Sequence, residues 1–202
     1  MTKNDPATAL WAFFSSNASK IAAAYDSKNY GWLDEKLSPL VKAISQNINW
    51  ELGPYHHPDN TFVLSPGIRK NLVVTRAVIA QAPSIPGWFF EPAKPAKELL
   101  SLFFEAEGFS VCGDTWKYRL TSYNGGEFVD IEVFYDPSTS PPTTHERMFC
   151  ERVIEAILGE ELRLDRVGYI TPTLVPDVSS VEKATDIRYL KEHLGEVLAP
   201  IQ

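Results

Sequence analysis

The stretch WELGPYHHPDNTFVLSPGIRKNLVVTRAVIAQAPSIPGWFFEP, residues 50–92, decides the fold of this 202-residue chain. It continues a strand predicted over about 48–53, and a polar turn leads to a second strand over about 61–65. A Pro-Gly pair ends the second strand, and apolar residues at helical spacing then predict a helix over about 68–81. An aromatic strand over about 87–91 follows. One contiguous segment therefore predicts the order ββαβ.

Helices are predicted on both sides of this segment. A wide aromatic stripe at helical spacing predicts an amphipathic helix over about 7–25, and a second helix follows over about 31–46. Pro39 is expected to kink or restart the second helix, with Ser38 as the N-cap of the new piece. Downstream, apolar residues predict a helix over about 96–107.

A β-hairpin is predicted around an Asn-Gly pair at 124–125, because both residues tolerate the positive φ of a two-residue type I′ turn. Centring the turn there places Lys117 opposite Glu132 and Arg119 opposite Asp130. Opposite charges then share one face of the hairpin, and the other face is apolar.

A second ββαβ order follows from this hairpin. Thr143 and Glu146 fit a capping box, which predicts a helix over about 144–158. A strand over about 166–171 and a final helix over about 185–198 complete the chain.

The predicted fold class is α+β. Two ββαβ-like halves, about 48–92 and 115–175, are expected to form one mostly antiparallel sheet of about six strands with helices packed on it. Helical additions at both ends complete a single domain, 1–202, and Pro92–Pro95 is the predicted boundary between the halves.

Charge is divided unevenly along the chain, which carries a net charge of −7. Residues 1–100 hold 10 basic and 8 acidic side chains, whereas residues 101–202 hold 9 and 18. The acidic second half argues against a nucleic-acid partner, because binding to phosphates needs a basic face. It permits a basic protein partner or a second copy of the chain, and a solvated acidic surface would also account for it.

Targeting and membrane segments are not expected. The first ten residues lack the pattern of a signal peptide, and no apolar run approaches the roughly 20 residues of a membrane span. Two cysteines without metal-ligand spacing suit a reduced, cytoplasmic protein.

Three groups of residues have side chains that could carry chemistry, and each has a plainer interpretation. His56-His57 are the metal-ligand types, but adjacent histidines without an HxH or HExxH spacing are favoured as turn residues. Asp130, Glu132 and Asp136 alternate along one strand, and cross-strand pairing accounts for two of the three charges. Cys150 is favoured as a small core residue. We therefore expect no catalytic residue, no metal and no cofactor.

Hydrophobic and turn motifs suggest a family. The motifs are Leu10-Trp11-Ala12-Phe13-Phe14, Trp50-Glu51-Leu52-Gly53, Phe62-Val63-Leu64-Ser65, the segment Ala82-Pro83…Trp88, and Ile157-Leu158-Gly159-Glu160…Val167-Gly168-Tyr169-Ile170. With these motifs the chain resembles an uncharacterised bacterial domain family of unknown function. The resemblance implies an α+β bacterial protein and supplies no activity, so it assigns no catalytic residue.

The sequence permits two hypotheses about function. The favoured hypothesis is a non-enzymatic interaction or regulatory module that uses an acidic surface in the second half, formed by Glu146, Glu151, Glu155, Glu160 and Glu161. The alternative is a small-molecule-binding protein or hydrolase with an aromatic-lined pocket, for which the candidates are Trp88, Phe90, Trp116 and Tyr118.

Overall fold

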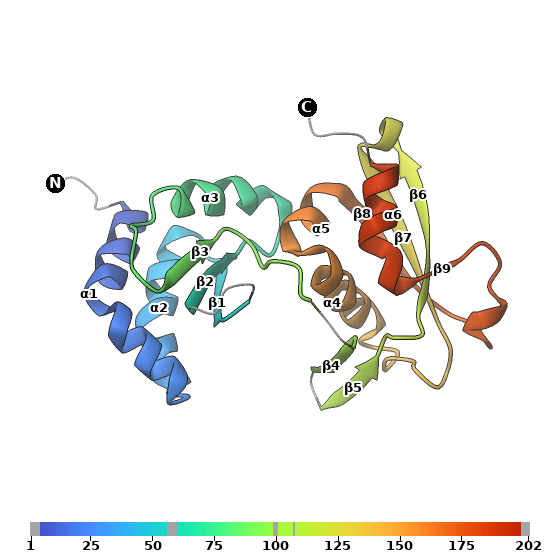
Figure 1. Ribbon diagram of the computed structural model, residues 1–202, viewed down its shortest axis with the longest axis horizontal. Coiled ribbons are helices and arrows are strands. Elements are labelled where there is room, and N and C mark those ends of the chain that lie inside the picture. The colour runs from blue at the N-terminus through green and yellow to red at the C-terminus, as the bar shows by residue number, and fades with distance from the viewer. Residues whose placement is uncertain (1–4, 56–59, 99–100, 107, 199–202) are drawn as a thin grey trace. The chain divides into compact units, whose positions relative to one another are not determined.

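The computed structural model describes residues 5–55, 60–98, 101–106 and 108–198 (Figure 1). The chain divides into two compact units, Met1–Pro95 and Ala96–Gln202. The division lies at the end of the Pro92–Pro95 segment, where the boundary between the halves is predicted. Of the helices described, none is long and apolar enough to cross a membrane.

The first unit has the predicted ββαβ order after two helices. Its elements are α1 (Pro6–Asp26), α2 (Tyr30–Ile44), β1 (Asn49–Gly53), β2 (Asn60–Ser65), α3 (Arg69–Ile79) and β3 (Trp88–Glu91). The central strand, β2, pairs antiparallel with β1 and parallel with β3. Helix α2 runs through Pro39 without restarting, so the prediction of a second helical piece capped by Ser38 is wrong.

Aromatic side chains hold the first unit together. The predicted stripe of α1 buries Leu10, Trp11 and Phe14. The ring of Phe14 lies edge-on to the rings of Phe62 and Trp88, with centroids 5.0 Å and 4.8 Å away. Such pairs contribute about 0.5–1.5 kcal/mol beyond the burial of their area. The helix is therefore fixed on the sheet by ring contacts as well as by hydrophobic burial.

The second unit contains two sheets and three helices. Its elements are β4 (Phe103–Ala106), β5 (Phe109–Cys112), β6 (Lys117–Tyr123), β7 (Phe128–Tyr135), α4 (Glu146–Leu158), α5 (Glu160–Arg166), β8 (Val167–Leu174), β9 (Thr185–Asp186) and α6 (Leu190–Val197), with short 3₁₀ turns between some of them. Strands β4 and β5 form a hairpin of their own, and the larger sheet has the order β8-β7-β6-β9.

The two units share one connectivity. In the second unit β7 pairs antiparallel with β6 and parallel with β8, as β2 does with β1 and β3 in the first. The α+β class is thus confirmed, and in the second unit two helices, α4 and α5, stand between β7 and β8. The single continuous sheet is wrong, because within the described ranges the strands form three separate sheets of three, two and four strands.

The larger sheet of the second unit is covered on one face by helices, as Figure 1 shows for α4, α5 and α6. Alternate residues of β7, among them Val129, Ile131 and Val133, point into this core. They meet the buried side chains of α4 and α6, such as Phe149 and Leu190.

The predicted helix over 96–107 is wrong. Its second part forms β4, which pairs with β5 so that Phe103 lies opposite Cys112. Gly108, with φ of 80°, lies in the connecting turn, a conformation that glycine adopts without strain. Phe103 is 55% exposed and Phe104 is half-buried against the core, which is the two-residue alternation of a strand.

The β6–β7 hairpin forms with a different register from the one predicted. Arg119 lies opposite Glu132, and Lys117 lies opposite Phe134, a shift of two residues. Asn124 and Gly125 have positive φ as predicted, but Gly126 does too, and pairing resumes only at Tyr123 and Phe128. A shift of two leaves every side chain on its predicted face, so the apolar and charged faces are as expected.

Helix α4 begins later than the capping box predicts. Its N-cap is His145, which makes no side-chain capping bond in the described structure, so Thr143 is not the cap. The His145 amide instead donates to the carbonyl of Pro142 at 2.7 Å, in the turn that follows two prolines. The end of the helix at Leu158, before Gly159 with φ of 82°, is as predicted.

Candidate functional site

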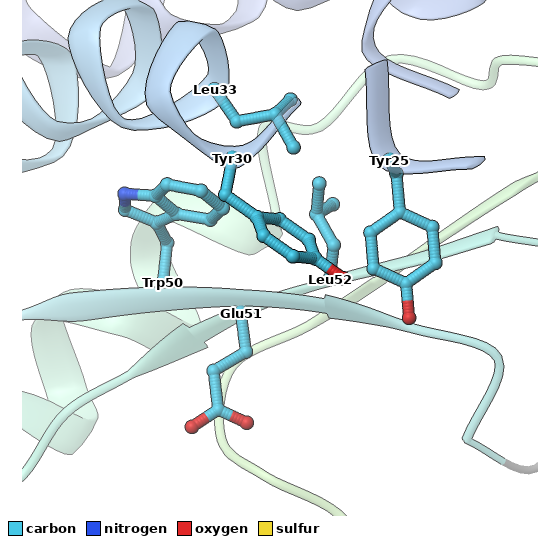
Figure 2. Close-up of a pocket in the computed structure, with 6 residues that line it drawn as sticks. All are labelled: Tyr25, Tyr30, Leu33, Trp50, Glu51 and Leu52. Carbon is cyan, nitrogen blue, oxygen red and sulfur yellow. The ribbon is translucent and has the colours of Figure 1, made fainter. Parts of the chain in front are cut away.

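A pocket of about 280 Å³ lies in the first unit, between the end of α1, the start of α2 and strand β1. It is lined by Tyr25, Tyr30, Leu33, Trp50, Glu51 and Leu52 (Figure 2). Three of these six residues are aromatic, and each of the three comes from a different element. Because several elements contribute a wall, the pocket belongs to the folded unit and not to one segment.

The turn between α1 and α2 brings the two tyrosines together. The amide of Lys28 donates to the carbonyl of Tyr25 at 3.0 Å, and Lys28 has a left-handed φ of 56°. Asn29 then caps α2, because its side-chain oxygen accepts from the Trp32 amide at 3.3 Å. The rings of Tyr25 and Tyr30 come to 6.5 Å between centroids and 65° between planes.

Strand β1 supplies the floor of the pocket. Trp50 and Leu52 share one face of the strand, as its two-residue alternation requires. The indole Nε1 of Trp50 donates to the Ser38 hydroxyl oxygen at 2.9 Å. That hydroxyl in turn donates to Oδ1 of Asp34 at 2.5 Å. This series of bonds from α2 fixes the plane of the indole ring.

Glu51 is one of the lining residues, but its carboxylate points away from the pocket. Figure 2 shows its carboxylate on the side of β1 opposite Trp50 and Tyr30. There, Oε1 lies 3.1 Å from Nζ of Lys94, and Oε2 accepts from the Tyr55 hydroxyl at 2.6 Å. The side chains that face the pocket are therefore phenol, indole and leucine groups.

The four aromatic residues expected to line a pocket are divided between two cores. Trp88 and Phe90 pack in the first unit, where Phe90 lies 5.1 Å from the ring of Trp11. Trp116 and Tyr118 are fully buried in the second unit. Burial raises the pKa of Tyr118 to about 12. These side chains fill the interior and do not line the pocket of Figure 2.

The five glutamates expected to form an acidic surface have different surroundings. Glu151 accepts from Nε of Arg147 at 2.8 Å, and a carboxylate oxygen of Glu155 lies 3.6 Å from Nε of Arg163. Glu160 is only 1% exposed and Glu161 is half-buried. Glu146 is half-buried beside Tyr135, whose pKa is raised by burial and by that carboxylate. At least two of the five charges are thus balanced by arginines within the same unit.

The predicted row of acidic residues lies partly on β7, with Asp130 and Glu132, and partly just after it, with Asp136. Oδ1 of Asp130 accepts from the Tyr169 amide at 2.8 Å, and Glu132 forms an ion pair with Arg119 at 3.2 Å. Oδ1 of Asp136 accepts from the Ser138 amide at 3.0 Å. Each of the three carboxylates thus has its own partners within the second unit.

The remaining candidates are a histidine pair and a cysteine. His56 and His57 lie outside the described residues. Cys150 is fully buried, and burial raises the pKa of its thiol to about 12, which keeps it in the unreactive protonated form. No group of three or more histidine, cysteine, aspartate or glutamate side chains in the described part of the chain is placed to hold a metal ion.

Comparison with protein-family models, with curated proteins and with solved structures finds no match to this chain. The resemblance to a bacterial domain family gains no support from these comparisons. Function therefore rests on the geometry of the chain itself.

Sequence reasoning missed Tyr25 and Tyr30 as candidate site residues, although it placed the two helix ends beside this turn within one residue of where they lie. The usable signal was a pair of tyrosines five residues apart across a turn, next to Trp50 and Leu52 alternating on a strand. What the sequence lacks is the direction in which α2 leaves the turn, and that direction decides whether the rings meet.

Proposed function

We propose that this chain is a non-enzymatic binding protein that holds a small ligand in the pocket of its first unit. The observation that carries the proposal is the convergence of Tyr25, Tyr30 and Trp50, from three elements, on one pocket. Ligand sites are concave, mainly apolar or aromatic, and have a few polar groups at their edges. The two phenol hydroxyls supply such groups here.

The size of the pocket limits the ligand. Sites for drug-sized ligands span about 300–1,000 Å³. The volume here, about 280 Å³, lies just below that range. The Tyr30 side chain is 56% exposed, so one wall of the pocket borders solvent and a ligand can enter without a movement of the backbone. The occupant is therefore a small molecule or the small end group of a larger one.

The chemistry of the lining favours binding over catalysis. General acid–base catalysis is most often carried out by a histidine or carboxylate side chain within hydrogen-bond reach of the reacting group. The carboxylate among the lining residues, Glu51, is turned to the other face of β1 and bound by Lys94 and Tyr55. The same geometry favours the small-molecule alternative over a partner surface made of glutamates, because arginines already balance Glu151 and Glu155.

A fragment screen by ¹H–¹⁵N NMR tests the proposal. Small neutral and cationic fragments are titrated into the full-length protein, and we expect some to shift the amide signals of residues 25–33 and 50–52. Replacement of Tyr30 by leucine removes one wall, and we expect affinity to fall about tenfold. Tyr189→Leu is the matched control, because Tyr189 is 55% exposed, nearly as exposed as Tyr30, and lies in the second unit.

Two results would contradict the proposal. One is a screen in which no fragment shifts the pocket amides. The other is a set of bound fragments whose affinity is the same in the Tyr30→Leu protein as in the Tyr189→Leu protein.

A further inference from the structure

We propose that the pocket takes a quaternary ammonium group, carried by a small molecule. This inference rests on the proposed function and names the chemistry of the ligand. It follows from three features of the described residues: the kind of rings that line the pocket, the fixed orientation of one ring, and the positions of the charged side chains nearby.

The rings present a surface that attracts cations. The face of an aromatic ring is electronegative, and tryptophan binds cations best, followed by tyrosine. One tryptophan and two tyrosines line this pocket. The planes of Tyr25 and Tyr30 meet at 65°, so they form walls at an angle and not a parallel stack. A compact, rounded cation can contact several such walls at once, whereas a flat aromatic ligand stacks on only one.

The indole is held in place before a ligand arrives. Its Nε1 hydrogen is already used by Ser38, which is itself bound to Asp34. The indole N–H is therefore not available to a ligand, and what Trp50 offers is the ring itself. A ring fixed in this way loses little conformational entropy on binding, which raises affinity.

No basic side chain lines the pocket among the described residues. Lys94, which reaches β1, binds Glu51 on the far face of the strand. The turn between the helices carries Asp26 and Lys28, which have opposite charges and are not lining residues. A cation in the pocket therefore meets no repulsive partner among the lining side chains.

The exposure of the pocket favours a cation over a neutral apolar molecule as its ligand. Because Tyr30 remains half exposed, an uncharged ligand would gain only part of the energy that full burial provides. Attraction between a cation and a ring operates at exposed sites as well as at buried ones. A quaternary ammonium group combines both contributions, since its methyl groups are apolar and its charge is delocalised over them.

The decisive experiment compares choline with 3,3-dimethyl-1-butanol, which has the same shape but no charge. Both are titrated into the full-length protein by ¹H–¹⁵N NMR. We expect choline to bind about tenfold more tightly than the alcohol, and to lose about tenfold in affinity in Tyr30→Leu and in Trp50→Leu. Tyr189→Leu should bind choline as the unaltered protein does. Because Trp50 is half-buried, the exposed Tyr30 provides the variant that retains the fold.

The outcomes separate the two proposals. Equal affinity for choline and the alcohol, both sensitive to Tyr30→Leu, would overturn the cation inference and leave the binding pocket standing. Binding of other fragments at the pocket without binding of choline would do the same. A trimethyllysine peptide that binds more tightly than choline would overturn the assignment to a small molecule. Failure of every ligand to shift the pocket amides would overturn both proposals.

Discussion

Ser38 shows how one hydroxyl can connect two elements and fix a site. It was predicted to cap a restarted helix, because a serine before a proline suits an N-cap. In the structure α2 continues, and the hydroxyl accepts from Trp50 on β1 while donating to Asp34 on α2. The hydroxyl therefore has one partner nearby in sequence, Asp34, and one that is distant, Trp50. No local pattern could have named Trp50.

Replacing Ser38 by alanine should lower the free energy of unfolding by about 1 kcal/mol, because the indole N–H of Trp50 loses its protein partner. Denaturant unfolding followed by fluorescence measures the change. Ser16→Ala is the matched control, since Ser16 is an exposed helical serine and shares the gain in helix propensity. Equal stability of the two variants would show that the bond contributes nothing.

At the scale of elements, the strands and faces of the β6–β7 hairpin were predictable from the sequence, whereas its register was not. The alternation of apolar and charged residues predicted both strands and both faces correctly. The register was wrong because a glycine follows the Asn-Gly pair, which allows a four-residue loop as readily as a two-residue one. A shift of two residues changes the partners but not the faces, so the hydrophobic pattern could not detect it.

A double-mutant cycle can test this register in solution. Arg119 and Glu132 form an ion pair at 3.2 Å between side chains that are about 40% exposed. Their coupling energy should be about 0.5 kcal/mol, as for other exposed pairs. Lys117, the partner predicted for Glu132, lies opposite Phe134, and its Nζ donates to the Ser179 carbonyl at 3.4 Å. A cycle on Lys117 and Glu132 should therefore give no coupling, and the reverse pattern would support the predicted register.

Asp114 binds the two residues directly before β4, which are not helical. Its Oδ1 accepts from the Leu102 amide at 2.7 Å and its Oδ2 accepts from the Ser101 hydroxyl at 2.8 Å. The carboxylate thus ties the chain after β5 to the residues before β4 and closes the hairpin. Helix propensity around residues 96–107 competes with this tertiary bond, and sequence reasoning considered only the propensity.

Protonation of Asp114 should weaken the second unit. The Leu102 amide bond, followed by the Ser101 and Cys112 bonds, lowers the pKa of Asp114 against the opposing effect of burial. A lowered folded pKa means that the stabilisation is present above the unfolded value, near 3.9, and is lost as pH falls through the folded value. We expect Asp114→Ala to cost about 2 kcal/mol at neutral pH and less at about pH 2.

Denaturant unfolding at both pH values measures this change, with Asp26→Ala as a control at an exposed aspartate. A cost that is the same at both pH values would mean that the carboxylate charge is not what holds the hairpin.

At the scale of the whole molecule, the α+β class was predictable and the joining of sheets was not. The strands and helices of each unit follow one another along contiguous segments, so local periodicity indicates them. Whether two sheets share an edge depends on strand ends and loops. In the second unit one edge is the two-residue β9, and the other is β8, which contains Pro172 and a register shift beside Asp130. Short strands, prolines and bulges are features that keep an edge from pairing further.

The division into units predicts that the first unit carries the pocket by itself. Each hydrophobic core is formed by residues of one unit only, and every lining residue lies between Tyr25 and Leu52. A protein of residues 1–95 should therefore unfold cooperatively and bind choline within about twofold of the full chain. Circular dichroism and NMR titration measure the two properties, and a protein of residues 96–202 serves as the control that should not bind. An unfolded first unit would show that its core is insufficient alone, whereas a folded unit that fails to bind a ligand of the full chain would show that the pocket of Figure 2 is incomplete.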